Sequence, residues 1–79
     1  MKKVGAVLHL ARSGRLIIRV QDGPPPGAIL LDDDEKKVAK VVELLGPTKA
    51  PYVSAIPLTD RVKKVIGKSV YLRLDGGGQ

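Results

Sequence analysis

The segment from Gly46 to Val53, Gly-Pro-Thr-Lys-Ala-Pro-Tyr-Val, constrains the conformation of this chain more than any other. Each proline fixes its own φ at about −65° and removes a backbone donor. Pro47 and Pro51 also push the residues before them towards extended geometry. The chain therefore turns stiffly and then reaches Tyr52. A rigid turn that presents a tyrosine suits docking, because little conformational entropy is lost on binding. The same spacing is also typical of a plain tight connection between two secondary elements.

The chain is short, and its core must be built from aliphatic side chains. Its 79 residues make one small domain near the lower limit for a self-sufficient core. The hydrophobic fraction is 43%, without Phe or Trp. A core of branched aliphatics is compatible with a small β-barrel. Since so small a domain is marginally stable alone, we expect a closed sheet or a covering partner.

Composition excludes several classes of protein. The absence of cysteine excludes disulfides, thiolate metal sites and thiol redox chemistry. No apolar run approaches the ~18 residues that span a membrane, and no signal peptide opens the chain. We therefore expect a soluble, cytoplasmic protein that contacts no membrane. The chain has no asparagine and a single methionine. Few thermolabile residues together with abundant Lys and Arg are typical of a thermophile.

The net charge of +6 points to polyanionic or acidic partners. The basic residues are scattered, with two clusters, Lys36-Lys37-Lys40 and Lys63-Lys64-Lys68. The candidate RNA-proximal residues are Lys36, Lys37, Lys40, Lys63 and Lys64, although a charge run is as often a solvated face. Base stacking needs aromatic rings, and Tyr52 and Tyr71 are the only two. The composition therefore favours a domain that works close to RNA but does not itself recognise an RNA sequence.

Apolar periodicity predicts a mostly β domain. Residues 2–10 read as a strand with Val4, Ala6, Leu8 and Leu10 on one face. The Ser13-Gly14 turn joins this strand to a second over residues 15–20. Further strands are expected over residues 28–31, 52–56 and 69–74. We expect residues 1–75 to form one domain and residues 76–79 a flexible Gly-rich tail.

Residues 36–45 show helical rather than strand spacing. Val38, Val41, Val42 and Leu45 recur at the interval of a helix face, and Gly46-Pro47 would end such a helix. Local periodicity alone therefore predicts a helix here. Residues 60–67 show the same pattern over a shorter length, followed by a C-terminal glycine.

No segment carries an enzyme signature, and we expect neither catalytic residues nor a cofactor or metal. His9 has no orienting partner or nucleophile at a recognisable spacing. The acidic run Asp32–Glu35 lacks the alternating ligands of a Ca²⁺ loop and is expected to form a solvated turn. Residues 23–27, Gly-Pro-Pro-Pro-Gly, lack the N–H donors of a phosphate loop and read as a stiff connector.

Several motifs together resemble one family, the Gar subunit of archaeal H/ACA ribonucleoproteins. The opening residues 5–19, which include Gly-Ala-Val-Leu-His and Gly-Arg-Leu-Ile-Ile-Arg, resemble its first hairpin. A Pro-Gly loop and a short strand ending in Asp32 follow. The most specific match is Gly-Pro-x-x-x-Pro-Tyr-Val at 46–53, and Ile-Gly-Lys-x-Val-Tyr-Leu at 66–72 completes the resemblance. Ala39 replaces a usual glycine, which affects the bend of the strand there, and Thr48 replaces a usual valine.

The resemblance implies an all-β fold, a small six-stranded β-barrel like those of translation-factor second domains. The resemblance therefore predicts a strand over residues 36–45, where local periodicity predicts a helix. It also predicts a closed sheet without open edges. It also implies a non-catalytic accessory subunit that binds the catalytic subunit of the guide-RNA-dependent pseudouridine synthase and meets guide RNA and substrate rRNA mainly indirectly. Such a subunit promotes substrate loading and product release in ribosome biogenesis. No small-molecule substrate is implied.

The docking residues expected from the rigid turn are Gly46, Pro47, Thr48, Pro51, Tyr52 and Val53. A second hypothesis, supported by the net charge, is a β-barrel that binds RNA directly in ribosome maturation or translation. The two differ in whether the isolated protein binds RNA with a steep dependence on salt.

Overall fold

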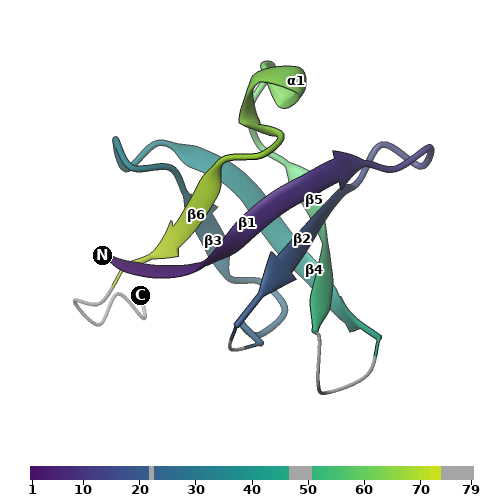
Figure 1. The fold of residues 1–79 in the computed structure, drawn as a ribbon, viewed down its shortest axis with the longest axis horizontal. Coiled ribbons are helices and arrows are strands. Elements are labelled where there is room, and N and C mark those ends of the chain that lie inside the picture. The colour runs from purple at the N-terminus through teal and green to yellow at the C-terminus, as the bar shows by residue number, and fades with distance from the viewer. Residues whose placement is uncertain (22, 47–50, 74–79) are drawn as a thin grey trace.

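A computed structural model describes residues 1–21, 23–46 and 51–73, and this part of the chain closes into an antiparallel β-barrel (Figure 1). Its strands run in the order β1-β2-β5-β4-β3-β6 around the barrel. The elements are β1 Lys2–Leu10, β2 Leu16–Val20, β3 Ile29–Leu31, β4 Lys37–Leu45, β5 Tyr52–Pro57, α1 Val62–Val65 and β6 Ser69–Leu72. The all-β, six-stranded barrel expected from the sequence is confirmed.

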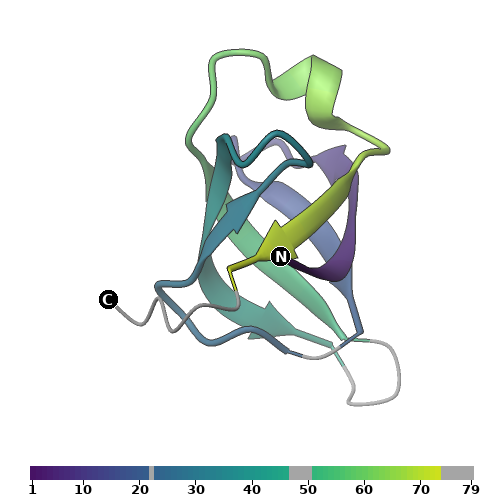
Figure 2. The same cartoon turned by 90° about the vertical axis from the view of Figure 1, so that its left-hand side faces the viewer.

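The core fills the inside of the barrel with small branched side chains. Alternate residues of β2, namely Leu16, Ile18 and Val20, point inwards and are buried. Val53 and Ala55 of β5 face them across the sheet. Val65 of α1 joins the same cluster, and α1 lies over one end of the barrel (Figure 2). Closure leaves no long open edge, which is how an aliphatic core this small is shielded from water.

The expected alternation along β1 is wrong, because the strand contains two irregularities. The register shifts between Lys3 and Gly5 against β6, and between Val7 and His9 against β2. Each extra residue turns the following side chains to the other face. Val4 and Val7 are therefore buried, whereas Leu8 and Leu10 are 42% and 36% exposed.

Residues 37–45 form strand β4, not the helix that local periodicity predicts. β4 pairs with β5 from Ala39 to Leu45 and with β3 on its other side. A register shift between Val41 and Glu43 interrupts the alternation, which is why the valines mimic helical spacing. Pairing on both sides outweighs the local preference, as the resemblance implied.

Residues 60–67 do contain a helix, α1, which is only four residues long. It is followed by Gly67, whose φ of +87° is the left-handed conformation that glycine adopts without strain. The strand expected over 69–74 ends at Leu72, and residue 74 and the tail 76–79 lie outside the described residues. Within the described part of the chain, no helix has the length and apolarity to cross a bilayer.

Candidate functional site

The outer face of β5 brings an aromatic ring together with aliphatic side chains from three strands. Since Val53 and Ala55 point inwards, alternation turns Tyr52, Ser54 and Ile56 to the outer face, where Ser54 is buried at 6% exposure. Register places Tyr52 between Arg19 of β2 and Leu45 of β4. Directly paired residues on one face are about 5 Å apart at Cβ, so these side chains are neighbours.

The next two rows extend this surface along the barrel. Ser54 lies between Ile17 of β2 and Glu43 of β4, and Ile56 pairs with Lys40 of β4. Ile56 is 44% exposed, although it is aliphatic. We call the set Ile17, Arg19, Lys40, Glu43, Leu45, Tyr52, Ser54 and Ile56 the β5 face. It is an apolar stripe with charged residues beside it, the composition of many docking surfaces.

The docking residues expected from the sequence have different positions. Gly46 is exposed with a φ of +80°, and Pro51 and Tyr52 are half-buried. Val53 is fully buried, so its expected role as a partner contact is wrong: it supports Tyr52 from inside the barrel. Pro47 and Thr48 lie outside the described residues.

The backbone at Pro51 is held in place by a hydrogen bond to a neighbouring strand. The carbonyl oxygen of Pro51 accepts a hydrogen bond of 3.1 Å from the backbone N–H of Val20, which ties the start of β5 to the end of β2. Tyr52 therefore enters the sheet from an anchored residue. A side chain held this way loses less freedom on binding than one on a loose loop.

Six residues of the β5 face were not candidate site residues from the sequence, namely Ile17, Arg19, Glu43, Leu45, Ser54 and Ile56. Those of β2 and β4 are brought to the same face as Tyr52 only by strand pairing. The alternation over 16–20 would have shown that Ile17 and Arg19 point outwards. Leu45, which pairs with Tyr52 from β4, could not be placed in the same way, because the helical spacing of residues 36–45 does not predict a strand there.

The acidic run forms the turn between β3 and β4. Asp32 Oδ1 accepts hydrogen bonds from the backbone N–H groups of Asp34 and Lys36, at 2.8 and 2.9 Å. Carboxylate oxygens of Asp32, Asp33 and Asp34 lie within 4.8 Å of one another. The expected solvated turn is confirmed. Glu35 forms an ion pair of 3.8 Å with Arg73, and both side chains are more than half exposed, so the pair contributes little to stability.

We expect Asp32→Ala to lower the free energy of unfolding by about 1 kcal/mol, because two turn N–H groups lose their acceptor. Urea denaturation measures this value. Asp33→Ala is the matched control, since it removes the same charge from the next, exposed residue. Equal losses in the two variants would mean that charge, rather than the turn hydrogen bonds, sets the effect.

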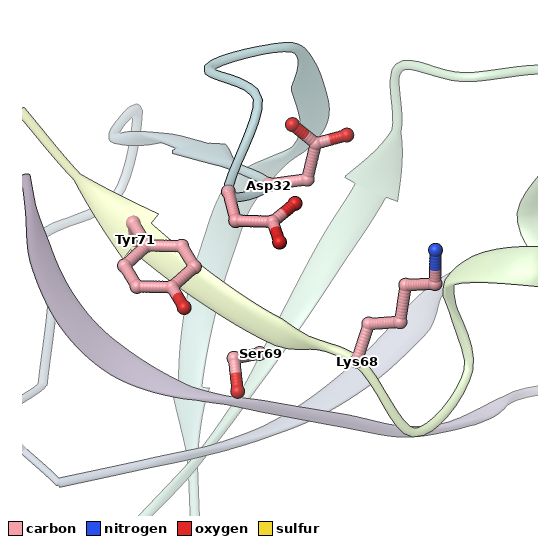
Figure 3. Close-up of a pocket in the computed structure, with 5 residues that line it drawn as sticks. Asp32, Lys68, Ser69 and Tyr71 are labelled. Atoms are coloured by element: carbon pink, nitrogen blue, oxygen red, sulfur yellow. The ribbon is translucent and has the colours of Figure 1, made fainter.

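A hollow of about 240 Å³ lies beside this turn (Figure 3). It is lined by Asp32, Asp33, Lys68, Ser69 and Tyr71. The hollow opens where β3 and β6 diverge, since these two strands pair only at Leu31 and Tyr71. Tyr71 therefore belongs to a polar site of mixed charge and not to the apolar β5 face.

The candidate RNA-proximal lysines fall into three places. Lys40 lies on the β5 face, Lys36 and Lys37 follow the acidic turn, and Lys63 and Lys64 lie on α1. All five are exposed. The acidic turn adds negative charge next to Lys36 and Lys37, so these two form a weaker anion site than the lysines of α1. His9 is exposed on β1 and is paired with aliphatic Ile17.

Comparison with known proteins places the chain beside an archaeal relative. No family model matches the chain. A protein of Methanothermobacter thermautotrophicus, described as uncharacterized, is 30% identical over 76 residues. The match covers 91% of this chain and 83% of that protein. This chain belongs to the same family as that archaeal protein.

Proposed function

We propose that this protein is a non-catalytic accessory subunit of an archaeal H/ACA ribonucleoprotein. Through the β5 face it binds the catalytic subunit of the pseudouridine synthase and promotes substrate RNA loading and product release in rRNA pseudouridylation. It meets the guide and substrate RNAs mainly through that partner. The observation that carries the proposal is the position of Tyr52, outward-facing between Arg19 and Leu45 on a closed barrel.

The fold supports this proposal. The six-stranded barrel agrees with the architecture that the resemblance implies, and the most specific motif of the resemblance ends on β5, at Tyr52 and Val53. The motif thus combines a core residue, Val53, with an outward-facing ring, Tyr52. A binding subunit needs this combination, because a buried neighbour holds the anchor in place before the partner arrives.

The chemistry of the surface also supports a protein partner. Tyr and Arg are the residue types most enriched among energetically dominant interface positions, and Tyr52 and Arg19 are directly paired. Aliphatic Leu45 is paired with Tyr52 on its other side, and Ile17 lies in the next row of the same face. The barrel presents these groups on strands, which are more rigid than loops, so binding costs little ordering.

We expect Tyr52→Ala to weaken binding to the synthase catalytic subunit by about 2 kcal/mol or more, roughly thirtyfold in Kd. The truncation removes a ring from one end of the β5 face, between Arg19 and Leu45, and leaves the core below it intact. Isothermal titration calorimetry with the purified synthase measures the change.

Tyr71→Ala is the matched control, because it removes the other tyrosine from the hollow on a different strand. It should leave the affinity within about threefold of the unmodified protein, as most residues outside an anchor cluster do. Full affinity of the Tyr52→Ala variant would contradict docking through the β5 face. Failure of the unmodified protein to co-purify with the synthase would contradict the assignment to the ribonucleoprotein.

A second candidate function, direct RNA binding in ribosome maturation or translation, is favoured by the net charge of +6. It predicts that the isolated protein binds single-stranded RNA and that log K falls linearly with log salt concentration. An electrophoretic shift at low ionic strength measures this directly. A complex with RNA in the absence of the synthase would favour this function over the accessory role.

A further inference from the structure

Glu43 places an acidic side chain on the β5 face of a basic protein. Among the described residues it is the only Asp or Glu that lies within a strand. The other described acidic residues lie in the turn of residues 32–35 or, in the case of Asp60, just before α1. Glu43 is exposed and pairs with Ser54 in the middle row of the β5 face. A chain with a net charge of +6 therefore carries a carboxylate next to its apolar stripe.

A bulge in β4 turns Glu43 to this face. Lys40 and Glu43 are three positions apart, so they would lie on opposite faces of a regular strand. The register shift between Val41 and Glu43 inserts one extra residue into β4. Both charged side chains therefore lie on the outer face, where they are paired with Ile56 and Ser54 respectively. Two strand positions separate these rows, a distance of roughly 7 Å. Two opposite charges are thus neighbours in a fixed order along β4.

Arg19 is the third charged residue of the β5 face, in the row of Tyr52. It is exposed, as are the two charged residues of β4. Within the part of the chain that the structure describes, none of the three forms an ion pair. Arg19 and Lys40 lie four strand positions and two strands apart, which is roughly 15 Å. This separation exceeds the Debye length of about 8 Å at physiological salt, so a partner must meet the two cations with separate groups.

We propose that the protein surface that covers the β5 face carries three charged side chains in a matching order: a carboxylate against Arg19, a cation against Glu43 and a carboxylate against Lys40. The inference rests on the proposed function, since it concerns the site through which the synthase catalytic subunit binds. It adds that the order of charges selects the partner together with the ring of Tyr52. Opposite charges across an interface fix its register and reject wrong partners, because like charges in contact cost affinity.

The negative charge of Glu43 favours a protein over an RNA strand as the occupant of this face. A phosphate backbone carries one sign of charge, so a carboxylate beside Lys40 repels it. A folded protein surface carries both signs and can present a cation to Glu43 and a carboxylate to Lys40. The two occupants therefore predict opposite effects of reversing this charge: Glu43→Lys weakens the binding of such a protein and strengthens the binding of RNA.

The test exchanges the two neighbouring charges of β4 in the full chain and leaves the net charge unaltered. We expect K40E/E43K to raise the Kd for the purified synthase catalytic subunit about tenfold in isothermal titration calorimetry, since two attractive contacts become repulsive. The single substitution E43K should raise the Kd about threefold. D33K/K36E is the matched control and should bind like the unmodified protein, because it exchanges one exposed acid and one exposed base outside the β5 face. Circular dichroism establishes that each variant is folded.

The outcomes separate this inference from the proposed function. Unchanged affinity of K40E/E43K, or tighter binding of E43K, would overturn the charge order even where Tyr52→Ala weakens binding as expected. Equal weakening by D33K/K36E would also overturn it, because the exchange would then act through the overall field of the protein. No binding of the unmodified protein, or full affinity of Tyr52→Ala, would contradict docking through the β5 face and the charge order with it.

Discussion

Gly5→Ala is expected to lower the free energy of unfolding by about 3 kcal/mol or more, since it forces a side chain into a site with no space. A Cβ at this position would overlap the backbone carbonyl oxygen of Arg19 and lie 3.0 Å from the Cα of Val20. Backbone atoms of a paired strand cannot move away as a flexible side chain can. The β1–β2 pairing must therefore shift along several residues. Urea denaturation followed by circular dichroism measures the loss.

Gly23→Ala is the matched control, because it adds the same methyl group to a glycine in a loop. The nearest atoms there are the side-chain Cδ1 and Cδ2 of Leu44, at 3.3 and 3.6 Å. Leu44 is 52% exposed and can adopt another rotamer. We expect a change of less than about 1 kcal/mol for this variant. Similar losses in both variants would contradict the close approach of β1 and β2 at Gly5.

The second large effect is expected for Ile18→Ala, which should reduce the free energy of unfolding by about 3 kcal/mol. Ile18 is fully buried and contributes to the core from β2. Its side chain pairs with Val53 across the sheet. The deletion removes apolar contacts from a core that has no large ring to fill the space, so the cavity persists. Thermal and urea unfolding together give the change.

Ile17→Ala provides the comparison, since it is the adjacent residue of the same strand with its side chain on the outside. Ile17 is half-buried and faces Ser54 on the β5 face. Its truncation should cost about 1 kcal/mol in stability, while it weakens binding of a partner to the β5 face. A loss in stability equal to that of Ile18→Ala would mean that β2 does not have the inward and outward faces described above.

Stability and the proposed docking are linked through the closure of the barrel. The β5 face draws Arg19, Tyr52 and Leu45 from three strands that are distant in sequence. These side chains are neighbours only while β2, β5 and β4 remain paired in register. A variant such as Gly5→Ala should therefore weaken partner binding in proportion to the fraction unfolded, even though Gly5 lies outside the β5 face.

The expected elements that proved accurate had strong local signals. The strand over residues 2–10 has the predicted bounds, and the Ser13-Gly14 turn joins it to β2. Gly14 has a φ of +90°, and its N–H donates to the carbonyl oxygen of Ala11. Glycine is the residue that such a turn requires. These features depend on neighbouring residues alone, and the sequence is sufficient to find them.

The errors arose where register irregularities change which side chains face inwards. In β1 the shifts at Gly5 and His9 exposed Leu8 and Leu10, and in β4 the shift before Glu43 produced helical spacing in a strand. A bulge depends on the partner strand, which single-chain periodicity does not contain. The positions of Tyr52 on the outer face and Val53 in the core also depend on partner strands, because pairing with β2 and β4 decides which face of β5 is covered.

The amino-acid sequence alone determined the class of core, the turns, the basic charge and the stiff approach of Pro51 to Tyr52. These properties follow from composition and from the local chemistry of proline and glycine. Only the tertiary structure decided that residues 37–45 are a strand, that Val53 is buried, and that Arg19, Leu45 and Tyr52 share one surface. The reason is physical: closing the barrel gives every strand a hydrogen-bonded neighbour on both sides, and that long-range gain outweighs local preference.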